Sequence, residues 1–224
     1  MDDVLVDGVL RFANYYQDHM VLQRAPQRAV VWGYSDAFNM PIFLAINNKI
    51  YRTRSSSSAA NSLGESIWSV TLDPQTEEGP FQVNVTQPSA NGTVSTIILK
   101  DVLFGDVWLC SGQSNMGFSL RNMFNASIEI ANASNYPKIR LFTAGLQQSY
   151  TPEEELLGIA LNWSVASNET AASGANSAVC WLYGRMIHQA LDGRPVGLVH
   201  TSWGGTSIEW WSPPEALAEC NITQ

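Results

Sequence analysis

A serine at residue 114 lies in a sequence setting that suits nucleophilic chemistry. Ser114 belongs to the segment Ser-Gly-Gln-Ser-Asn-Met at residues 111–116, which directly follows an apolar run ending at Cys110. A strand, a turn of small residues and then a helix would place the Ser114 hydroxyl at the carboxyl end of the strand, beside backbone amides of the new helix. Such amides stabilise the oxyanion that forms when a serine attacks an ester. The segment therefore predicts an acyl-transfer serine at the edge of a sheet.

A pair of glycines later in the chain could supply a second donor. Gly204 and Gly205 follow an apolar run at residues 195–203, and a residue without a Cβ lets bare backbone approach a ligand. Each pattern alone also fits a plainer structure, with Ser114 as a helix N-cap and the glycines as a turn. The nucleophile elbow of the α/β-hydrolases has glycine two residues after its serine. Met116 stands there in this chain, so that pattern is not met.

The first hundred residues have the texture of an antiparallel β domain. Runs rich in Val, Ile, Phe, Trp and Thr are separated by Gly, Pro, Asn and Ser, and they lie at residues 29–33, 41–46, 66–72, 81–86 and 94–99. Short strands at this spacing are typical of a β-sandwich or a similar antiparallel domain.

From about residue 100 the chain alternates between strands and helices. Apolar strands are expected at residues 101–110, 138–143 and 195–203. Residues 177–191 predict an amphipathic helix whose sheet-facing side chains are spaced by three and four: Val179, Leu182, Tyr183, Met186, Ile187 and Ala190. This alternation predicts an α/β layer structure with a mostly parallel sheet that binds ligands at the carboxyl ends of its strands. Two domains are expected, a β-rich domain at 1–100 and an α/β domain at 101–224.

Composition argues against several classes of partner. The 224 residues are 45% hydrophobic and 14% charged, with a formal net charge of -8. No basic stripe is present to neutralise a phosphate backbone, so nucleic acid is not expected as a partner. No apolar run approaches the roughly 20 residues that span a bilayer, and no Cys or His spacing resembles a metal site.

Glycosylation signals indicate a luminal protein. Seven Asn-x-Ser/Thr sequons occur, at Asn84, Asn91, Asn125, Asn132, Asn162, Asn168 and Asn221. Chance would supply about one or two, so we expect a secreted or lysosomal glycoprotein, although residues 1–10 do not read as a signal peptide. Cys110, Cys180 and Cys220 are odd in number, which leaves at least one thiol unpaired within the chain. The first two lie in apolar runs and are expected to be small core residues, whereas Cys220 is expected to be free to bond to a group outside the chain.

Several segments together resemble one family of enzymes. Residues 12–33 include His-Met-Val-Leu-Gln-Arg at 19–24 and Val-Trp-Gly at 31–33. Residues 101–116 read Asp-Val-Leu-Phe-Gly-Asp-Val-Trp-Leu-Cys-Ser-Gly-Gln-Ser-Asn-Met, and residues 202–210 read Ser-Trp-Gly-Gly-Thr-Ser-Ile-Glu-Trp. With residues 177–184 also matching, the chain resembles the N-terminal part of the sialate O-acetylesterases, serine esterases of the SGNH type. The resemblance implies an incomplete SGNH-like three-layer α/β domain preceded by an antiparallel β-sandwich-like domain.

The resemblance also implies a reaction. Ser114 would attack an acetyl ester, the amides of Ser114 and Gly205 would hold the oxyanion, and water would release acetate from an acyl-enzyme. The implied substrate is a 9-O-acetylated sialic acid, with the 4-O-acetylated form as a second, free or on glycans, and no cofactor is needed. Further candidates for substrate binding are Gln113, Asn115, Arg121, Trp203 and Glu209. Trp203, Trp210 and Trp211 could stack on a sugar ring, although aromatic residues after a strand more often belong to a core.

The catalytic base of this family is missing from the chain. The family supplies an oxyanion-hole Asn and an Asp-x-x-His segment from later blocks, and no Asp-x-x-His occurs among these 224 residues. Structural roles are expected for the three histidines: His19 at a turn, His188 on the predicted helix and His200 within a strand. A serine without a base is a poor nucleophile, so residues 1–224 alone are expected to show little or no esterase activity.

Three origins for such a chain remain open: a shortened isoform, an incomplete gene prediction, or the N-terminal chain of an enzyme cleaved into two subunits. In the last case a C-terminal subunit carrying the Asp and His would restore the site. An alternative from another class is a non-catalytic glycan-binding or regulatory fragment, in which the β domain and the aromatic cluster bind sugar and Ser114 is idle.

Overall fold

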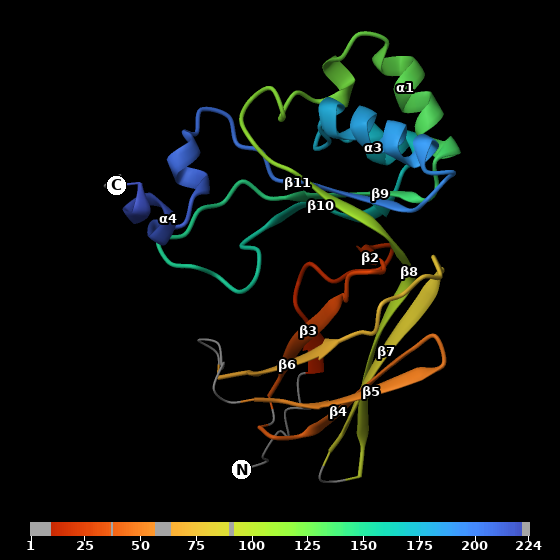
Figure 1. The fold of residues 1–224 in the computed structure, drawn as a ribbon, viewed down its shortest axis with the longest axis vertical. Coiled ribbons are helices and arrows are strands. Elements are labelled where there is room, and N and C mark those ends of the chain that lie inside the picture. Colours follow the sequence, from red (N-terminus) through yellow and green to blue (C-terminus); the bar gives the residue numbers. More distant parts are fainter. Residues whose placement is uncertain (1–9, 37, 57–63, 90–91, 221–224) are drawn as a thin grey trace, which may run out of the picture.

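The computed structural model describes residues 10–36, 38–56, 64–89 and 92–220, which form a β-rich part and an α/β part (Figure 1). The strands are β1 (Leu10–Phe12), β2 (Val21–Gln23), β3 (Val30–Ser35), β4 (Pro41–Ile46), β5 (Lys49–Arg54), β6 (Ser66–Thr71), β7 (Phe81–Pro88), β8 (Val94–Cys110), β9 (Ile139–Ala144), β10 (Ile159–Val165) and β11 (Val196–His200). The helices are α1 (Ala126–Asn132), α2 (Asn168–Ala171), α3 (Ala178–Ala190) and α4 (Pro214–Glu219), with 3-10 turns η2 (Leu120–Asn122), η3 (Ala133–Asn135) and η4 (Ile208–Trp211).

The β-rich part consists of two antiparallel layers around one core. β1, β3 and β6 form a three-stranded sheet, while β5, β4, β7 and the first half of β8 form one end of a larger sheet. Side chains alternate along β4, where Ile42, Leu44 and Ile46 are buried and their neighbours are half-buried. They share a core with Trp68 of β6 and with Leu72. This is the antiparallel arrangement that the sequence predicts.

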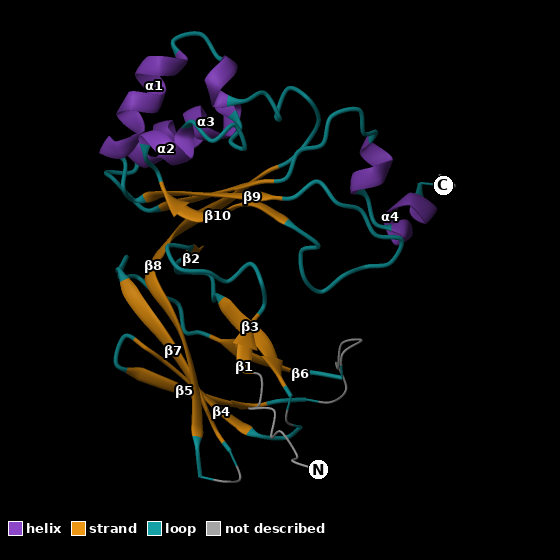
Figure 2. Ribbon diagram, turned by 180° about the vertical axis from the view of Figure 1, so that it is seen from behind, coloured by secondary structure: helices purple, strands orange, loops and turns teal. Residues whose placement is uncertain are grey.

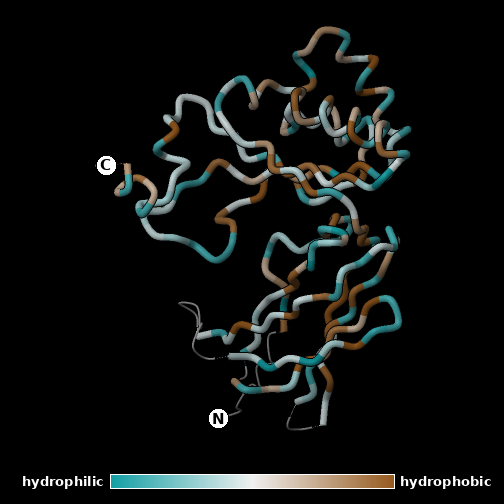
Figure 3. Tube along the Cα trace, viewed as in Figure 1, coloured by the Kyte–Doolittle hydropathy of each residue, from teal (hydrophilic) through white to brown (hydrophobic). Residues whose placement is uncertain are grey.

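The α/β part has a sheet covered by helices on one face. The strand order is β10-β9-β11-β8, in which β9, β11 and β8 run parallel and β10 is antiparallel at the edge. The helices α1, α2 and α3 lie on the same face of this sheet (Figure 2). Hydrophobic stretches follow the strands in the interior of both parts (Figure 3). The predicted mixed α/β class is confirmed, and the carboxyl ends of β8 and β11 meet at one edge of the sheet.

The helix α3 meets the sheet with a different face from the one predicted. Its bounds are close to the expected 177–191, but its buried residues are Ala178, Cys180, Trp181, Gly184 and His188. Val179, Tyr183 and Met186 of the predicted face are exposed. A Cβ at Gly184 would lie 2.6 Å from a methyl carbon of Leu198 in β11, so the glycine side is where helix and sheet can approach closely. Leu182 and Ile187 of the predicted face do pack against the core. The rest of the prediction was wrong, because apolar spacing alone does not reveal a close contact made by glycine.

One long strand joins the two parts. β8 has 17 residues and pairs in turn with β7 up to Val102, with β2 from Leu103 to Gly105, and with β11 from Asp106 to Cys110. The change near residue 100, from a pattern of short strands to alternating strands and helices, falls inside this strand. The division into domains 1–100 and 101–224 stays a prediction.

A buried arginine of β9 links this strand to the loop before β2 and to the middle of β8. Arg140 is 5% exposed, and it donates to the two carboxylate oxygens of Asp101 at 2.6 and 3.2 Å and to the carbonyl of His19 at 3.0 Å. The Nδ1 atom of His19 lies 2.7 Å from Oδ2 of Asp101. Burial opposes ionisation of Asp101, but the hydrogen bonds from Arg140 and His19 outweigh it and hold the pKa of Asp101 below its usual range. The carboxylate is therefore charged at neutral pH.

Replacing Asp101 by asparagine is expected to lower the free energy of unfolding by about 2 kcal/mol, because the buried Arg140 loses the charge on its partner. Asparagine tolerates the left-handed backbone of Asp101, whose φ is 54°, so the change tests the charge. Asp73→Asn is the matched control: Asp73 and its partner Lys49 are both open to solvent, and such surface pairs contribute little to stability. Urea unfolding at pH 7 measures both, and equal losses would contradict the account.

Candidate active site

The loops that follow β8 and β11 run side by side. Beyond the last paired residues of the two strands, the amide of Thr201 donates to the carbonyl of Cys110 at 3.0 Å, and the amide of Trp203 donates to the carbonyl of Gly112 at 2.9 Å. The ladder of hydrogen bonds thus continues into the loops. It brings the segments predicted to hold the nucleophile and the second donor to the same edge of the sheet, as the carboxyl ends of parallel strands require.

Ser114 is an exposed residue in a single turn. The turn is closed by the amide of Gly117, which donates to the carbonyl of Gln113 at 3.0 Å. The helix predicted directly after Ser114 was wrong, because the chain instead extends and pairs with the loop before α3, where the amide of Ala178 donates to the carbonyl of Phe118 at 2.8 Å. Ser114 lies beyond the carboxyl end of β8 as predicted, in a turn instead of at the start of a helix.

The two glycines form a turn that contacts Ser114. A Cβ at Gly204 would lie 3.7 Å from the Cβ of Ser114, so the two turns are in van der Waals contact. Gly205 has a φ of 79°, a conformation that glycine adopts at little cost. Apart from its two neighbours in the chain, no described residue has an atom within 4 Å of the position that a Cβ of Gly205 would take, so the space beside it is open. The role of Gly205 as an oxyanion donor stays a prediction.

Two neighbouring cavities open beside these turns. The smaller, of about 280 Å³, is lined by Ser111, Gly112, Gln113, Thr206, Ser207, Ile208 and Trp211. The larger, of about 890 Å³, is lined by Gln147, Gln148, Ser149, Tyr150, Trp203, Thr206, Ser207, Glu209, Trp210 and Trp211. Thr206, Ser207 and Trp211 belong to both, so the cavities adjoin. Sequence reasoning missed residues 147–150, because the connection after β9 carries no motif and reaches the site only through the fold.

The remaining candidates for substrate binding fall in different places. Gln113 lines the smaller cavity, and Trp203 and Glu209 line the larger one. Asn115 is exposed in the turn of Ser114. Arg121 lines neither cavity, because its guanidinium packs against Gly174 in the loop before α3. Within the described ranges, no group of three His, Cys, Asp or Glu side chains is placed to hold a metal ion.

Both ring nitrogens of His200 have partners other than Ser114. Nδ1 lies 2.8 Å from the carbonyl oxygen of Ala175, and Nε2 lies 2.6 Å from the hydroxyl of the buried Ser202. A carbonyl oxygen only accepts, so Nδ1 carries the proton and Nε2 of the neutral ring accepts from Ser202. Burial lowers the pKa of His200, and the hydrogen bond to Ala175 offsets this only in part.

The other two histidines are engaged away from the site. His19 pairs with Asp101, and Nδ1 of His188 lies 2.6 Å from the carbonyl oxygen of Arg194. Since His200 is also engaged, none of the three histidines is hydrogen-bonded to Ser114 in the described residues. In the described part of the chain, Ser114 therefore lies beside the glycine turn without a histidine partner.

The pKa of His200 predicts a loss of stability in weak acid. Because the pKa is lower in the folded protein than in the unfolded chain, the unfolded chain takes up the proton first as the pH falls below about 6.5. The free energy of unfolding should therefore fall through this window. Urea unfolding between pH 8 and 5 should show a smaller fall for His200→Gln, which keeps hydrogen-bonding groups without the titration. An identical pH dependence of the two proteins would contradict this assignment.

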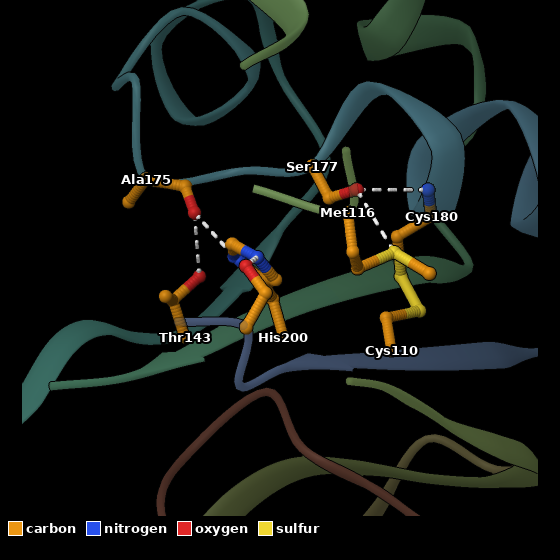
Figure 4. The surroundings of a disulfide bond; sticks show 8 residues. Cys110, Met116, Thr143, Ala175, Ser177, Cys180 and His200 are labelled. Atoms are coloured by element: carbon orange, nitrogen blue, oxygen red, sulfur yellow. Dashed lines mark hydrogen bonds between the residues drawn. A yellow bond between two sulfur atoms is a disulfide. The ribbon is translucent and has the colours of Figure 1, made fainter. Parts of the chain in front are cut away.

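A disulfide fixes the strand that leads into the Ser114 turn. Cys110, the last residue of β8, is bonded to Cys180 in the first turn of α3, with their Cα atoms 5.8 Å apart. Figure 4 shows Met116 and Ser177 beside this bond, and the Ser177 hydroxyl lies 3.3 Å from the sulfur of Met116. Both cysteines are buried, as predicted, but their pairing was missed, because the types and spacing of three cysteines do not reveal which two meet. Cys220 is free and exposed.

Comparisons with known proteins agree on one family. Residues 104–223, more than half of the 224, match the family described as "Carbohydrate esterase, sialic acid-specific acetylesterase". The chain is 40% identical to the sialate O-acetylesterase of Rattus norvegicus and 38% identical to that of Homo sapiens, each over 95% of this chain. It spans only 39% and 40% of the length of these two relatives.

A solved structure supports the same assignment. The crystal structure of a carbohydrate acetylesterase from Xanthomonas citri matches with a TM-score of 0.80 and 29% sequence identity, covering 94% of this chain and 44% of that one. The family match begins in β8 and includes the turn of Ser114, the disulfide, and the Gly204-Gly205 turn. This chain belongs to the family of sialic acid-specific acetylesterases among the carbohydrate esterases.

Proposed function

We propose that this chain supplies the nucleophile of a serine esterase that removes O-acetyl groups from sialic acids. The observation that supports this most is the exposed Ser114 beyond the carboxyl end of β8, in contact with the Gly204-Gly205 turn and inside the segment that matches the family. An attacking serine needs open space on one side and unobstructed backbone amides nearby. The exposure of Ser114 supports the first requirement, and its contact with the glycine turn supports the second.

The reaction would run in two steps. The Ser114 hydroxyl loses its proton to a base and attacks the acetyl carbonyl, and the amides of Ser114 and Gly205 stabilise the oxyanion. As the bond between the acetyl carbon and the sugar oxygen breaks, the base gives its proton to that oxygen, so the sugar leaves with a free hydroxyl. Water then attacks the acyl-enzyme, which releases acetate and regenerates the Ser114 hydroxyl. Each oxyanion donor in such a site contributes about 10²- to 10³-fold in rate. No step of this scheme uses a cofactor.

The base would come from a polypeptide segment outside residues 1–224. Both nitrogens of His200 are occupied by Ala175 and Ser202, and the chain spans about two fifths of the length of the curated relatives. We propose that an Asp-x-x-His segment, on a C-terminal subunit or extension, completes the site. From Asp106 to Cys110, β8 pairs only with β11 among the described strands, which leaves an edge where a further strand could add.

The proposed substrate is a sialic acid acetylated at the 9-hydroxyl, with the 4-O-acetylated form as a second. The names of the rat and human relatives support the class of substrate. The resemblance to the sialate O-acetylesterases supports the two positions of the acetyl group.

We further propose that the protein is a secreted or lysosomal glycoprotein. The Cys110–Cys180 disulfide supports an oxidising compartment. Asn125, Asn132, Asn162 and Asn168 are exposed and Asn84 is half-buried, whereas Asn91 and Asn221 lie outside the described residues. Among the described helices, none is both long and apolar enough to span a membrane.

The proposed function is tested by measuring the release of acetate from 9-O-acetylated N-acetylneuraminic acid. It compares the chain alone with a chimera in which the chain is joined at its end to the C-terminal region of the rat relative. The chimera is expected to release acetate, and the chain alone little or none. A folded chimera that releases no acetate would contradict the proposal.

One observation favours the alternative of a non-catalytic glycan-binding or regulatory fragment. None of the three histidines is hydrogen-bonded to Ser114 in the described part of the chain, so Ser114 is without a base there. The chimera experiment separates the two functions: sugar binding without acetate release in the chimera would support the alternative.

A further inference from the structure

The larger cavity beside the site is built by two segments that are distant in sequence. Residues 147–150 come from the connection between β9 and β10, and residues 203–211 follow β11. Figure 1 shows that connection running out from the sheet toward the end of the chain that carries α4. At about 890 Å³, the cavity lies within the range of about 300–1,000 Å³ that small-molecule sites occupy.

Aromatic side chains in this cavity are exposed to solvent. Tyr150 is fully exposed, Trp210 is 70% exposed and Trp211 is 38% exposed. Aromatic residues after a strand more often belong to a core, but Trp210 and Tyr150 contribute little to the core here. Exposed aromatic rings gathered at a concave surface are typical of binding sites, and their flat apolar faces suit the C–H faces of sugar rings.

One of these rings is held rigidly. The hydroxyl of Thr206 donates to the carbonyl of Trp203 at 2.8 Å and accepts from Nε1 of Trp211 at 2.8 Å. Trp211 lines both cavities. A ring fixed before binding loses little conformational entropy when a ligand stacks on it, so Trp211 forms a preorganised wall between the larger cavity and the turn of Ser114.

The charge of the larger cavity selects the kind of sugar. Glu209 is the one charged residue among those that line it; the polar ones include Gln147, Gln148, Ser149 and Ser207. The hydrogen bond from Ser207 lowers the pKa of Glu209, so its carboxylate is ionised at neutral pH. A fixed negative charge repels the carboxylate of a sialic acid and accepts hydrogen bonds from neutral sugar hydroxyls.

We propose that the cavity lined by Tyr150, Trp210, Trp211 and Glu209 binds the uncharged sugar residues that carry a sialic acid in a glycan. This inference rests on the proposed function, because it places the acetylated sialic acid at the smaller cavity beside Ser114 and the next sugars in the larger one. The protein then recognises a glycan chain in preference to a free monosaccharide.

Binding to the intact chain tests this without any need for catalysis. The probes are unacetylated sialyllactose, lactose and free N-acetylneuraminic acid, and ligand-observed NMR titration gives their dissociation constants. Sialyllactose is expected to bind about tenfold more tightly than the free acid, and lactose is expected to bind detectably. Trp210→Ala and Tyr150→Ala should each weaken sialyllactose binding by about tenfold, since each removes one stacking face.

Trp108 of β8 is partly exposed, packs against Tyr183 of α3 and lines neither cavity. Trp108→Ala is therefore the matched control, which should leave all three affinities unchanged. Equal affinities for sialyllactose and the free acid would overturn the proposal, as would unchanged sialyllactose binding in both cavity variants. The two proposals fail separately. If the chimera releases acetate but the chain shows no preference for glycan, only the proposed sugar-binding role of the cavity is refuted. If the chain binds glycan but the chimera releases no acetate, only the proposed esterase function is refuted.

Discussion

Acetate release by the chimera is expected to fall by about 10⁴-fold or more when Ser114 is replaced by alanine. The change removes the attacking oxygen, so only substrate binding and oxyanion stabilisation remain. Because Ser114 is exposed and its hydroxyl has no hydrogen bond among those found in the described residues, the fold should be unaffected. Initial rates at saturating substrate measure the effect on kcat.

The control is Ser69→Ala, which removes an exposed hydroxyl from β6 in the β-rich part. This variant should keep full activity. A fall of less than about tenfold for Ser114→Ala, in a variant that unfolds at the same urea concentration as the parent, would show that another group is the nucleophile.

Replacing Cys110 and Cys180 together by alanine is expected to lower the free energy of unfolding by about 4 kcal/mol. The bond closes a loop between residues 70 apart in sequence, and the loss of chain entropy in the unfolded state for a loop of this length corresponds to about that value. Urea unfolding without reductant measures the difference. The effect is large because the closed loop is long; in the folded protein the bond ties the end of β8, from which the Ser114 turn starts, to α3.

Cys220→Ala is the matched control, because Cys220 is free and exposed and should be replaceable at no cost. A reducing agent should lower the stability of the parent protein and leave the double variant unchanged. Equal stability of the parent and the double variant without reductant would contradict the structural role of the bond.

The sequence predicts where Ser114 and the glycine pair lie in the fold because the relevant signals are local; their catalytic roles stay a prediction. An apolar run followed by small residues marks where β8 ends, and the parallel pairing of β8 with β11 brings Ser114 to Gly204 without any detail of side-chain packing. The alternation along β4 likewise predicts a strand with one buried face. These features depend on residue type and period, which the sequence displays directly.

The parts that could not be predicted depend on contacts between distant segments. The buried face of α3 is decided by Gly184 against Leu198, and the extended chain after Ser114 is decided by pairing with the loop before α3. The exposure of Trp210 follows from the position of η4 at the rim of a cavity that a loop from β9 completes. In each case tertiary contacts override a local preference.

Two serines near the glycine turn have opposite surroundings: Ser114, the proposed nucleophile, is exposed and has no histidine partner in the described residues, whereas Ser202 is buried and is hydrogen-bonded to His200. His200 accepts from Ser202 at 2.6 Å, but Ser202 is 7% exposed and lies beneath Gly117, where a Cβ would come within 3.0 Å of its hydroxyl. Ser114 has the opposite environment, open to solvent and beside the glycine turn. Access to an ester therefore favours Ser114, and the hydrogen-bonded base favours Ser202.

Mapping the site of a covalent adduct decides between these two serines. A fluorophosphonate probe reacts with an activated serine, and tandem mass spectrometry of the labelled chimera identifies the modified residue. The proposed mechanism predicts an adduct on Ser114. An adduct on Ser202, or a folded chimera that stays unlabelled, would contradict it.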